Sequence, residues 1–235
     1  MKLQRVTGSP PTLEHGRWYQ DACGTAFAME LVGERWSLLI VRELMLGPRR
    51  FSDLRASLPG ISAKVLTERL ASMEAAGVLV RRKLAPPAAV QVYELSAWGY
   101  AAEPAIQELG RWAAMHRGHD PQLPLSPVSL MLSLRTMIDR EAAKALELTA
   151  GFSVGEDHFL AELKGGAMPV RRSDQAEIAA QADLALTAEV PLPLLRLIYG
   201  KQPLTQAEQA GVTFNGDRAL AKRFIALFSL PEKLA

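Results

Sequence analysis

Residues 51–77, with the sequence FSDLRASLPGISAKVLTERLASMEAAG, decide the fold of the first half of this chain. Pro59-Gly60 interrupts the stretch, because this pair ends a helix and starts a turn. We therefore expect a short helix over residues 51–58. After the turn, Ser62 is a good N-cap for a longer helix that stops at Gly77. The apolar residues that follow at helical spacing and predict its buried stripe are Leu66, Leu70 and Met73.

The segments on either side of this stretch complete a known order of elements. Upstream, residues 22–46 predict two helices that end at Gly47-Pro48. Downstream, residues 78–84 and 90–95 are rich in β-branched residues and leucine and predict a β-hairpin. A last helix is expected over residues 97–117, with Pro104 in its first turn or at a kink. This is the order of a winged helix-turn-helix, so the expected fold class of the first half is a winged helix within an α+β chain.

The charge of the chain is unevenly distributed. The net charge is only +2, but between Arg35 and Lys83 ten basic residues face four acidic ones. A compact basic segment in an otherwise acidic chain is what a surface that faces phosphate looks like. The alternative is a plain helical domain with a solvated, arginine-rich face, and composition does not separate the two.

Double-stranded DNA is the partner that this arrangement favours. The outer face of the longer helix can enter a major groove and reach base edges, and the hairpin can press on phosphate or on the neighbouring minor groove. Two arginines at the start of the short helix would clamp the backbone. The predicted DNA-binding residues are Arg49, Arg50, Ser62, Lys64, Thr67, Arg69, Arg81, Arg82 and Lys83, with Arg69 nearer the flank of its helix.

A long ordered series of residues carries a resemblance to a known family. The series comprises Cys23, Leu31–Ile40 (LVGERWSLLI), Arg42–Leu44 (REL), Gly47–Leu54 (GPRRFSDL), Leu58–Ser62 (LPGIS), Leu66–Leu70 (LTERL), Glu74–Gly77 (EAAG) and Tyr93–Ser96 (YELS). It closely resembles the HxlR-type, MarR-like winged-helix transcription regulators of bacteria. The resemblance implies a homodimer on a two-fold operator, with dimer contacts from the first and last helices of the domain. The sequence departs from the family at the wing tip, where residues 86–89 contain no basic side chain.

A second domain is expected after the proline-rich segment at residues 120–127, which places the domains at 1–120 and 127–235. Residues 130–137 predict a helix. Alternation from Leu146 to Phe152, the segments on either side of Gly165-Gly166, and residues 184–188 predict strands. Two helices, a short strand, a turn at Asn215-Gly216 and a final amphipathic helix follow. We therefore expect an α+β layer in which helices cover one apolar face of a sheet.

This second half resembles the sterol-carrier-protein-like domains, more diffusely. The residues that carry the resemblance are Ala182–Leu184, Tyr199-Gly200, Ala210-Gly211 and Phe214–Leu220. The resemblance implies an apolar tunnel and hence a hydrophobic small-molecule effector. The candidate ligand-binding residues are Leu194, Leu197, Ile198, Phe214, Phe224 and Phe228. Residues of this kind at helical spacing are also typical of ordinary core, and core packing is the interpretation that the spacing favours for each of them.

Cys23 is the single cysteine of the chain, so no internal disulfide can form. Near the start of a helix its thiolate would be stabilised, which allows an oxidation sensor. The sequence favours instead a small buried packing residue.

Other classes of protein find little support. Hydrophobic residues at 49% and charged residues at 22% match soluble globular proteins, and no apolar run is long enough to span a membrane. The basic N-terminus has no apolar stretch behind it, so we expect a cytoplasmic protein without a membrane partner. The sequence contains no phosphate loop, nucleophile elbow or paired-carboxylate motif, and we expect no enzyme activity, cofactor or metal site. The remaining alternative is a lipid or acyl carrier whose winged helix is a protein interaction module.

Overall fold

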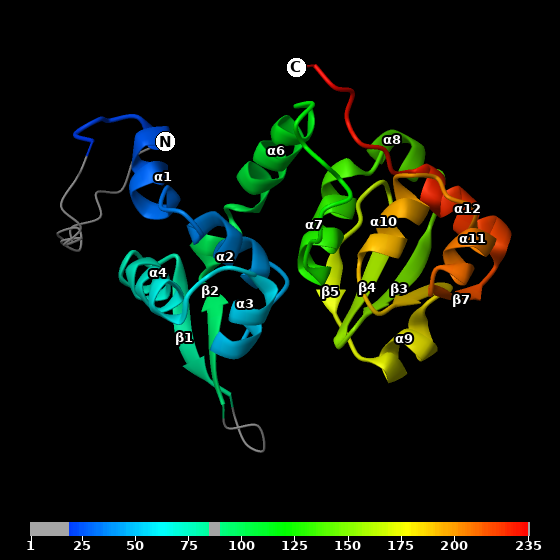
Figure 1. Ribbon diagram of the computed structural model, residues 1–235, viewed down its shortest axis with the longest axis horizontal. Coiled ribbons are helices and arrows are strands. Elements are labelled where there is room, and N and C mark those ends of the chain that lie inside the picture. Colours follow the sequence, from blue (N-terminus) through cyan, green and yellow to red (C-terminus); the bar gives the residue numbers. More distant parts are fainter. Residues whose placement is uncertain (1–18, 85–89, 235) are drawn as a thin grey trace. The chain divides into compact units, whose positions relative to one another are not determined.

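The computed structural model describes residues 19–84 and 90–234, and its contacts divide the chain into two units (Figure 1). The first unit ends at Ala101 and the second begins at Ala102, apart from Met45–Gly47, which group with the second. The predicted domain limits, 1–120 and 127–235, stay a prediction. The wing tip at residues 85–89 lies outside the described residues.

The first unit has the winged-helix order that the sequence predicts. Its elements are α1 (Gly24–Val32), α2 (Ser37–Leu44), α3 (Phe51–Ser57), α4 (Ala63–Ala75), β1 (Leu79–Lys83), β2 (Gln91–Leu95) and α5 (Ala97–Tyr100). The hairpin of β1 and β2 extends beyond the helices (Figure 1).

Helix α4 is stabilised by an N-cap and by a buried apolar stripe. The Ser62 hydroxyl oxygen accepts a hydrogen bond from the Val65 backbone N–H at 3.2 Å and so caps the helix. The apolar stripe of Leu66, Leu70 and Met73 is buried, with at most 1% of each residue exposed. The predicted cap and stripe of α4 are both confirmed.

The hairpin is fixed to the segment before α3. Strands β1 and β2 pair antiparallel, with Arg81 opposite Tyr93. The backbone of Tyr93 exchanges two further hydrogen bonds with that of Arg49, at 2.8 and 2.9 Å. This bridge places the N-terminus of α3 beside the base of the wing.

The single helix expected over residues 97–117 is two helices, so that prediction is wrong. Helix α5 ends at Tyr100, and α6 begins at Glu103 with Pro104 in its first turn. In one continuous helix the proline ring would meet the carbonyl group of Tyr100, and the missing N–H would break a backbone hydrogen bond. Pro104 therefore starts the second helix.

The second unit surrounds a five-stranded sheet of order β5-β4-β3-β6-β7. Its elements are α6 (Glu103–Ala114), α7 (Pro127–Met137), α8 (Arg140–Ala143), β3 (Leu148–Val154), β4 (Asp157–Leu163), β5 (Val170–Arg172), α9 (Gln175–Gln181), β6 (Leu184–Ala188), α10 (Leu192–Ile198), α11 (Leu204–Gln209), β7 (Thr213–Gly216) and α12 (Arg218–Ala226). Strands β3 and β6 are parallel, and the other neighbours are antiparallel. The unit is the expected mixture of helices and sheet.

Helices pack against both faces of this sheet, which corrects the expectation of one covered face. On one face, a Cβ atom built on Gly151 of β3 would lie 2.5 Å from Cγ2 of Ile178 in α9. The absence of a side chain at Gly151 therefore lets α9 approach the strand closely. On the other face Phe152 packs against Phe224 of α12, with ring centroids 6.3 Å apart. Figure 1 shows α10 lying across the sheet and α9 at the end of the strands.

Three further features of the second unit differ from the sequence prediction. Helices α8 and α9 were not predicted, because each is short and buries one side chain. Asn215 and Gly216 form no turn but belong to β7, where they pair with Ala185 and Leu184 of β6.

Helix α6 is tied to the rest of the second unit by polar contacts. Its Glu103 carboxylate forms an ion pair with Arg135 of α7 at 2.8 Å, and Arg111 donates to the carbonyl oxygen of Thr136. Beyond its end, the ammonium group of Lys233 donates to the carbonyl oxygens of Ala114 and His116 at 2.9 and 3.0 Å. These contacts group α6 with the second unit. The sequence predicts this helix as part of the first domain.

Candidate nucleic-acid interface

The outward face of α4 carries polar side chains in its first half and small side chains in its second half. Lys64, Thr67 and Glu68 are exposed there, and Ala71 and Ala75 follow at the same helical spacing. Because the opposite face is buried, this is the side that α4 can offer to a partner.

The two hydroxyl groups near the start of α4 are engaged by its own backbone. Ser62 caps the helix, and the Thr67 hydroxyl donates to the carbonyl oxygen of Ala63 at 2.9 Å. The side chain of Lys64 is 85% exposed, and its Nζ atom lies 3.9 Å from Oε1 of Glu68. Among Ser62, Lys64 and Thr67 on this side of α4, Lys64 therefore has the most freedom to reach a base edge.

Three of the predicted DNA-binding arginines have carboxylate partners. Arg69 lies 3.3 Å from Glu34, in the loop before α2, and only 20% of its side chain is exposed. Arg81 pairs with Glu74 at 2.6 Å, and Arg82 pairs with Glu94 at 2.8 Å. The hydrogen bond to Glu74 raises the pKa of Arg81 above its ordinary value. Arg69 thus fixes α4 to the loop between α1 and α2, whereas Arg81 and Arg82 remain half exposed on the wing.

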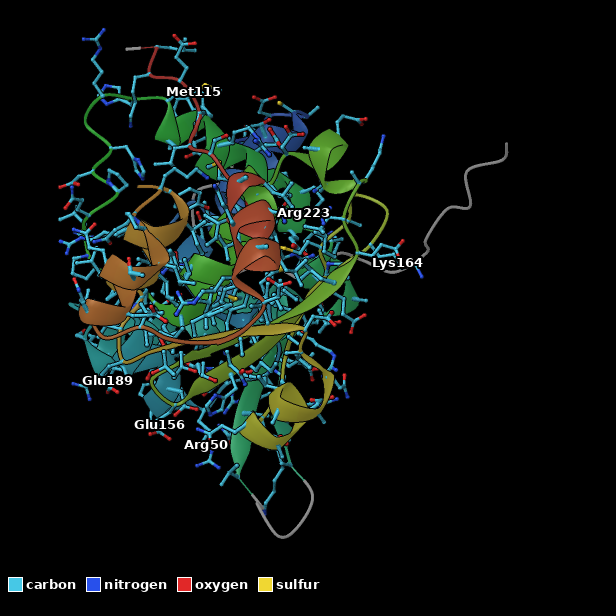
Figure 2. The ribbon with its side chains drawn as sticks, turned by 90° about the vertical axis from the view of Figure 1, so that its right-hand side faces the viewer. Arg50, Met115, Glu156, Lys164, Glu189 and Arg223 are labelled. Carbon is cyan, nitrogen blue, oxygen red and sulfur yellow. The ribbon has the colours of Figure 1, made fainter. Side chains whose placement is uncertain are left out.

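The remaining cations differ in how far they reach into solvent. Arg49 donates to the Ser57 hydroxyl at 3.3 Å and is partly buried. Arg50 is exposed at the start of α3 and lies at the surface (Figure 2), and Lys83 is exposed at the end of β1. Arg55, exposed on α3, was not among the predicted residues, although its position inside the basic segment was a signal that could have identified it. Within residues 19–84 and 90–234 we find no ion pair for Arg50, Arg55 or Lys83.

Cys23 is exposed, which corrects the expectation of a buried packing residue. It lies at the N-cap position of α1, before a helix that has no buried residue. The backbone N–H groups of Ala26 and Thr25 at the start of α1 lower the pKa of the Cys23 thiol. The helix N-terminus favours the anion in the way that the sequence suggested for a sensor.

The six candidate ligand-binding residues divide into five buried and one half-buried. Leu194, Leu197 and Ile198 of α10 are at most 1% exposed, and Phe224 and Phe228 are fully buried. The rings of Phe224 and Phe228 are 5.0 Å apart. Phe214, on the edge strand β7, is half-buried, and Arg218 lies over its ring.

Neither a metal site nor a membrane span is found in the part of the chain that the structure describes. No group of three His, Cys, Asp or Glu side chains there is suited to a metal ion, and no helix combines the length and apolarity needed to cross a bilayer. Burial and the Lys233 ammonium group lower the pKa of His119.

Comparison with known proteins matches the region that contains this surface. The HxlR-like helix-turn-helix family matches residues 31–121. The chain is 40% identical over 87 residues to the uncharacterized HTH-type transcriptional regulator YvaP of Bacillus subtilis, covering 37% of this chain and 80% of that protein. It is also 40% identical over 87 residues to the HTH-type transcriptional regulator YodB of the same organism, covering 37% and 77%. The solved structure of the reduced form of YodB is 33% identical and covers 43% of this chain and 100% of that chain, with a TM-score of 0.38.

Proposed function

The chain belongs to the HxlR-like helix-turn-helix family of transcriptional regulators, and we propose that it acts as a homodimer on a two-fold operator in double-stranded DNA. The observation that carries the proposal is the outward face of α4, where Lys64 stands exposed at the start of a capped helix. In this arrangement α4 enters the major groove, and Arg50 and Lys83 contact phosphate on either side of it.

Unpacked apolar side chains support the homodimer. Helix α1 buries none of its residues, and its Phe27 and Met29 are 44% and 41% exposed. Helix α6 leaves Leu109 and Trp112 exposed, with 69% of Trp112 open to solvent. Apolar side chains exposed on a helix favour burial against another chain. The family resemblance assigns dimer contacts to the first helix and to the helix predicted over residues 97–117, which correspond to α1 and to α5 with α6.

Selection of bound duplexes from a random pool tests the operator. We expect enriched sequences to be pseudo-palindromic, with half-sites about one helical turn or a multiple of it apart, because two copies of α4 must enter successive grooves on one side of the DNA. Light scattering of the complex should give two chains per site. Enrichment of a single half-site bound by one chain would contradict the homodimer. No enrichment at all would favour the carrier alternative.

A hydrophobic small molecule bound in the second unit is proposed as the effector of this regulator. The proposal is supported by the resemblance to lipid carriers and by the apolar side chains of α10 and α12 that are buried against the sheet. An apolar ligand gains about 0.8 kcal/mol for each methylene group that it buries. The ligand would have to lie among aromatic rings that already pack against one another. Replacing one of these rings therefore tests whether the interior is a ligand-binding chamber or a solid core.

Redox control through Cys23 is a second proposed property, favoured by the exposure of its thiol and the lowered thiol pKa. We expect diamide to change operator affinity of the wild type about 5-fold or more and to leave Cys23→Ser unaffected. Diamide accepts two hydrogens as two thiols join, and with one cysteine per chain the disulfide must link two subunits or a subunit and a small thiol. Equal responses of the two proteins would show that the thiol has no regulatory role.

A further inference from the structure

The acidic residues of the basic segment differ sharply in how their carboxylates are satisfied. The Glu43 carboxylate is buried and accepts from Nε of Arg42 at 3.0 Å, and that of Glu74 accepts from Arg81 at 2.6 Å. The Asp53 carboxylate accepts from the Ser52 hydroxyl at 3.0 Å and from the Arg50 backbone N–H at 3.4 Å. Each of these three groups has a structural partner within the first unit.

Glu68 differs from them. Its side chain is 50% exposed, and its nearest cation, Lys64, lies 3.9 Å away on the same helix. That distance is too long for a hydrogen bond, and we find no hydrogen bond for this carboxylate among the residues that the structure describes. Glu68 therefore presents a solvated negative charge on the outward face of α4.

A carboxylate in this place opposes general DNA binding. Phosphate groups repel it, and burial in a groove removes its water without a replacement. In the major groove only the exocyclic amino groups of cytosine and adenine can donate to it, whereas guanine and the O4 atom of thymine present acceptors. The negative charge of Glu68 is therefore compatible with a DNA site that offers an amino group at this position, and it lowers the affinity for a site that does not.

We propose that Glu68 is a specificity-determining residue that accepts a hydrogen bond from the amino group of a cytosine or adenine in each half-site. Lys64, one helical turn before it, donates to the acceptor atoms of a neighbouring guanine, so DNA replaces the loose Lys64–Glu68 pair with two stronger contacts. The hydroxyl of Thr67 is bonded to Ala63. Discrimination between bases by charge therefore depends on Lys64 and Glu68 and not on Thr67. This inference rests on the proposed function, because it requires α4 to lie in the major groove.

The test compares selected operators and binding isotherms for the wild type, Glu68→Ala and Glu68→Gln. For the wild type we expect one position of each half-site to favour an amino-bearing base by about 5- to 100-fold. In Glu68→Ala this preference should fall to nearly onefold, while affinity for random duplex rises and the other positions stay unchanged. Glu68→Gln should retain part of the preference, because its amide oxygen still accepts. The matched control is Glu141→Gln, which removes the same charge from an exposed side chain at α8 of the second unit.

The outcomes separate this inference from the function on which it rests. A wild type that selects an operator, combined with a Glu68→Ala variant that keeps every base preference, would overturn the role of Glu68 alone. So would a uniform loss of affinity at all positions, because that indicates a structural effect. A wild type that selects no sequence would overturn the proposed operator binding and the role of Glu68 with it.

Discussion

Simultaneous replacement of Arg50, Lys64 and Lys83 by alanine is expected to lower operator affinity by at least about 100-fold. A lost base contact costs about 1 to 3 kcal/mol, and each lost phosphate contact lowers the slope of log affinity against log salt by about 0.9. With Lys64 on a base and the other two on phosphate, the slope should therefore fall by about two. All three side chains are exposed, so the fold should remain intact. Fluorescence anisotropy across a salt series measures both quantities.

A second triple variant provides the control for net charge. Arg140, Lys164 and Lys222 are exposed cations of the second unit, and Lys164 lies at the surface in Figure 2. Their replacement by alanine removes the same charge, and we expect less than about a 5-fold change in affinity at moderate salt. Equal losses in the two triple variants would mean that general electrostatic attraction, rather than the surface of α3, α4 and the wing, binds DNA.

Phe224→Ala is expected to lower the free energy of unfolding of the second unit by about 3 to 5 kcal/mol. The ring is fully buried and packs against both Phe152 and Phe228, so its removal leaves a cavity inside a packed core. Denaturant unfolding monitored by circular dichroism measures the change. Val190→Ala, at a residue 53% exposed in the same unit, should stay within about 0.5 kcal/mol of the wild type.

The same variant tests the proposed ligand chamber. If an apolar molecule normally occupies this interior, protein purified from its host carries an additional mass in native mass spectrometry. Phe224→Ala should then lose this bound mass in addition to losing stability. A large loss of stability without any bound mass would assign the interior to core packing and remove the effector proposal.

Local signals predicted the elements that depend on neighbours in sequence. The cap at Ser62 and the apolar stripe of α4 are features of one segment, and the sequence located both. The break before Pro104 is also encoded locally, because a proline ring does not fit inside a continuous helix. The predicted single helix over residues 97–117 does not follow this signal. Asn215-Gly216 misled the prediction because a turn signal is local, whereas the pairing of these residues with β6 depends on a strand about thirty residues earlier.

The candidate interface was predictable in composition but not in detail. The basic segment and the outward position of Lys64 follow from the sequence and the helical period. The ion pairs do not, because Arg69 finds Glu34 and Arg82 finds Glu94 only when separate elements meet. The exposure of Cys23 escaped prediction for a similar reason, since it depends on which elements pack against α1.

The central strand β3 sets the order in which the chain can fold during its synthesis. Its partners are β4, which follows directly, and β6, which follows only after β5 and α9. Phe224, which covers Phe152 of β3, arrives with the last helix. As the ribosome extends the chain, the winged helix has all its elements once Ala101 has emerged, whereas the sheet stays open until α12 is made. The nascent protein therefore carries a folded DNA-binding unit ahead of an unfinished apolar sheet, and that interval is when it most needs protection from aggregation.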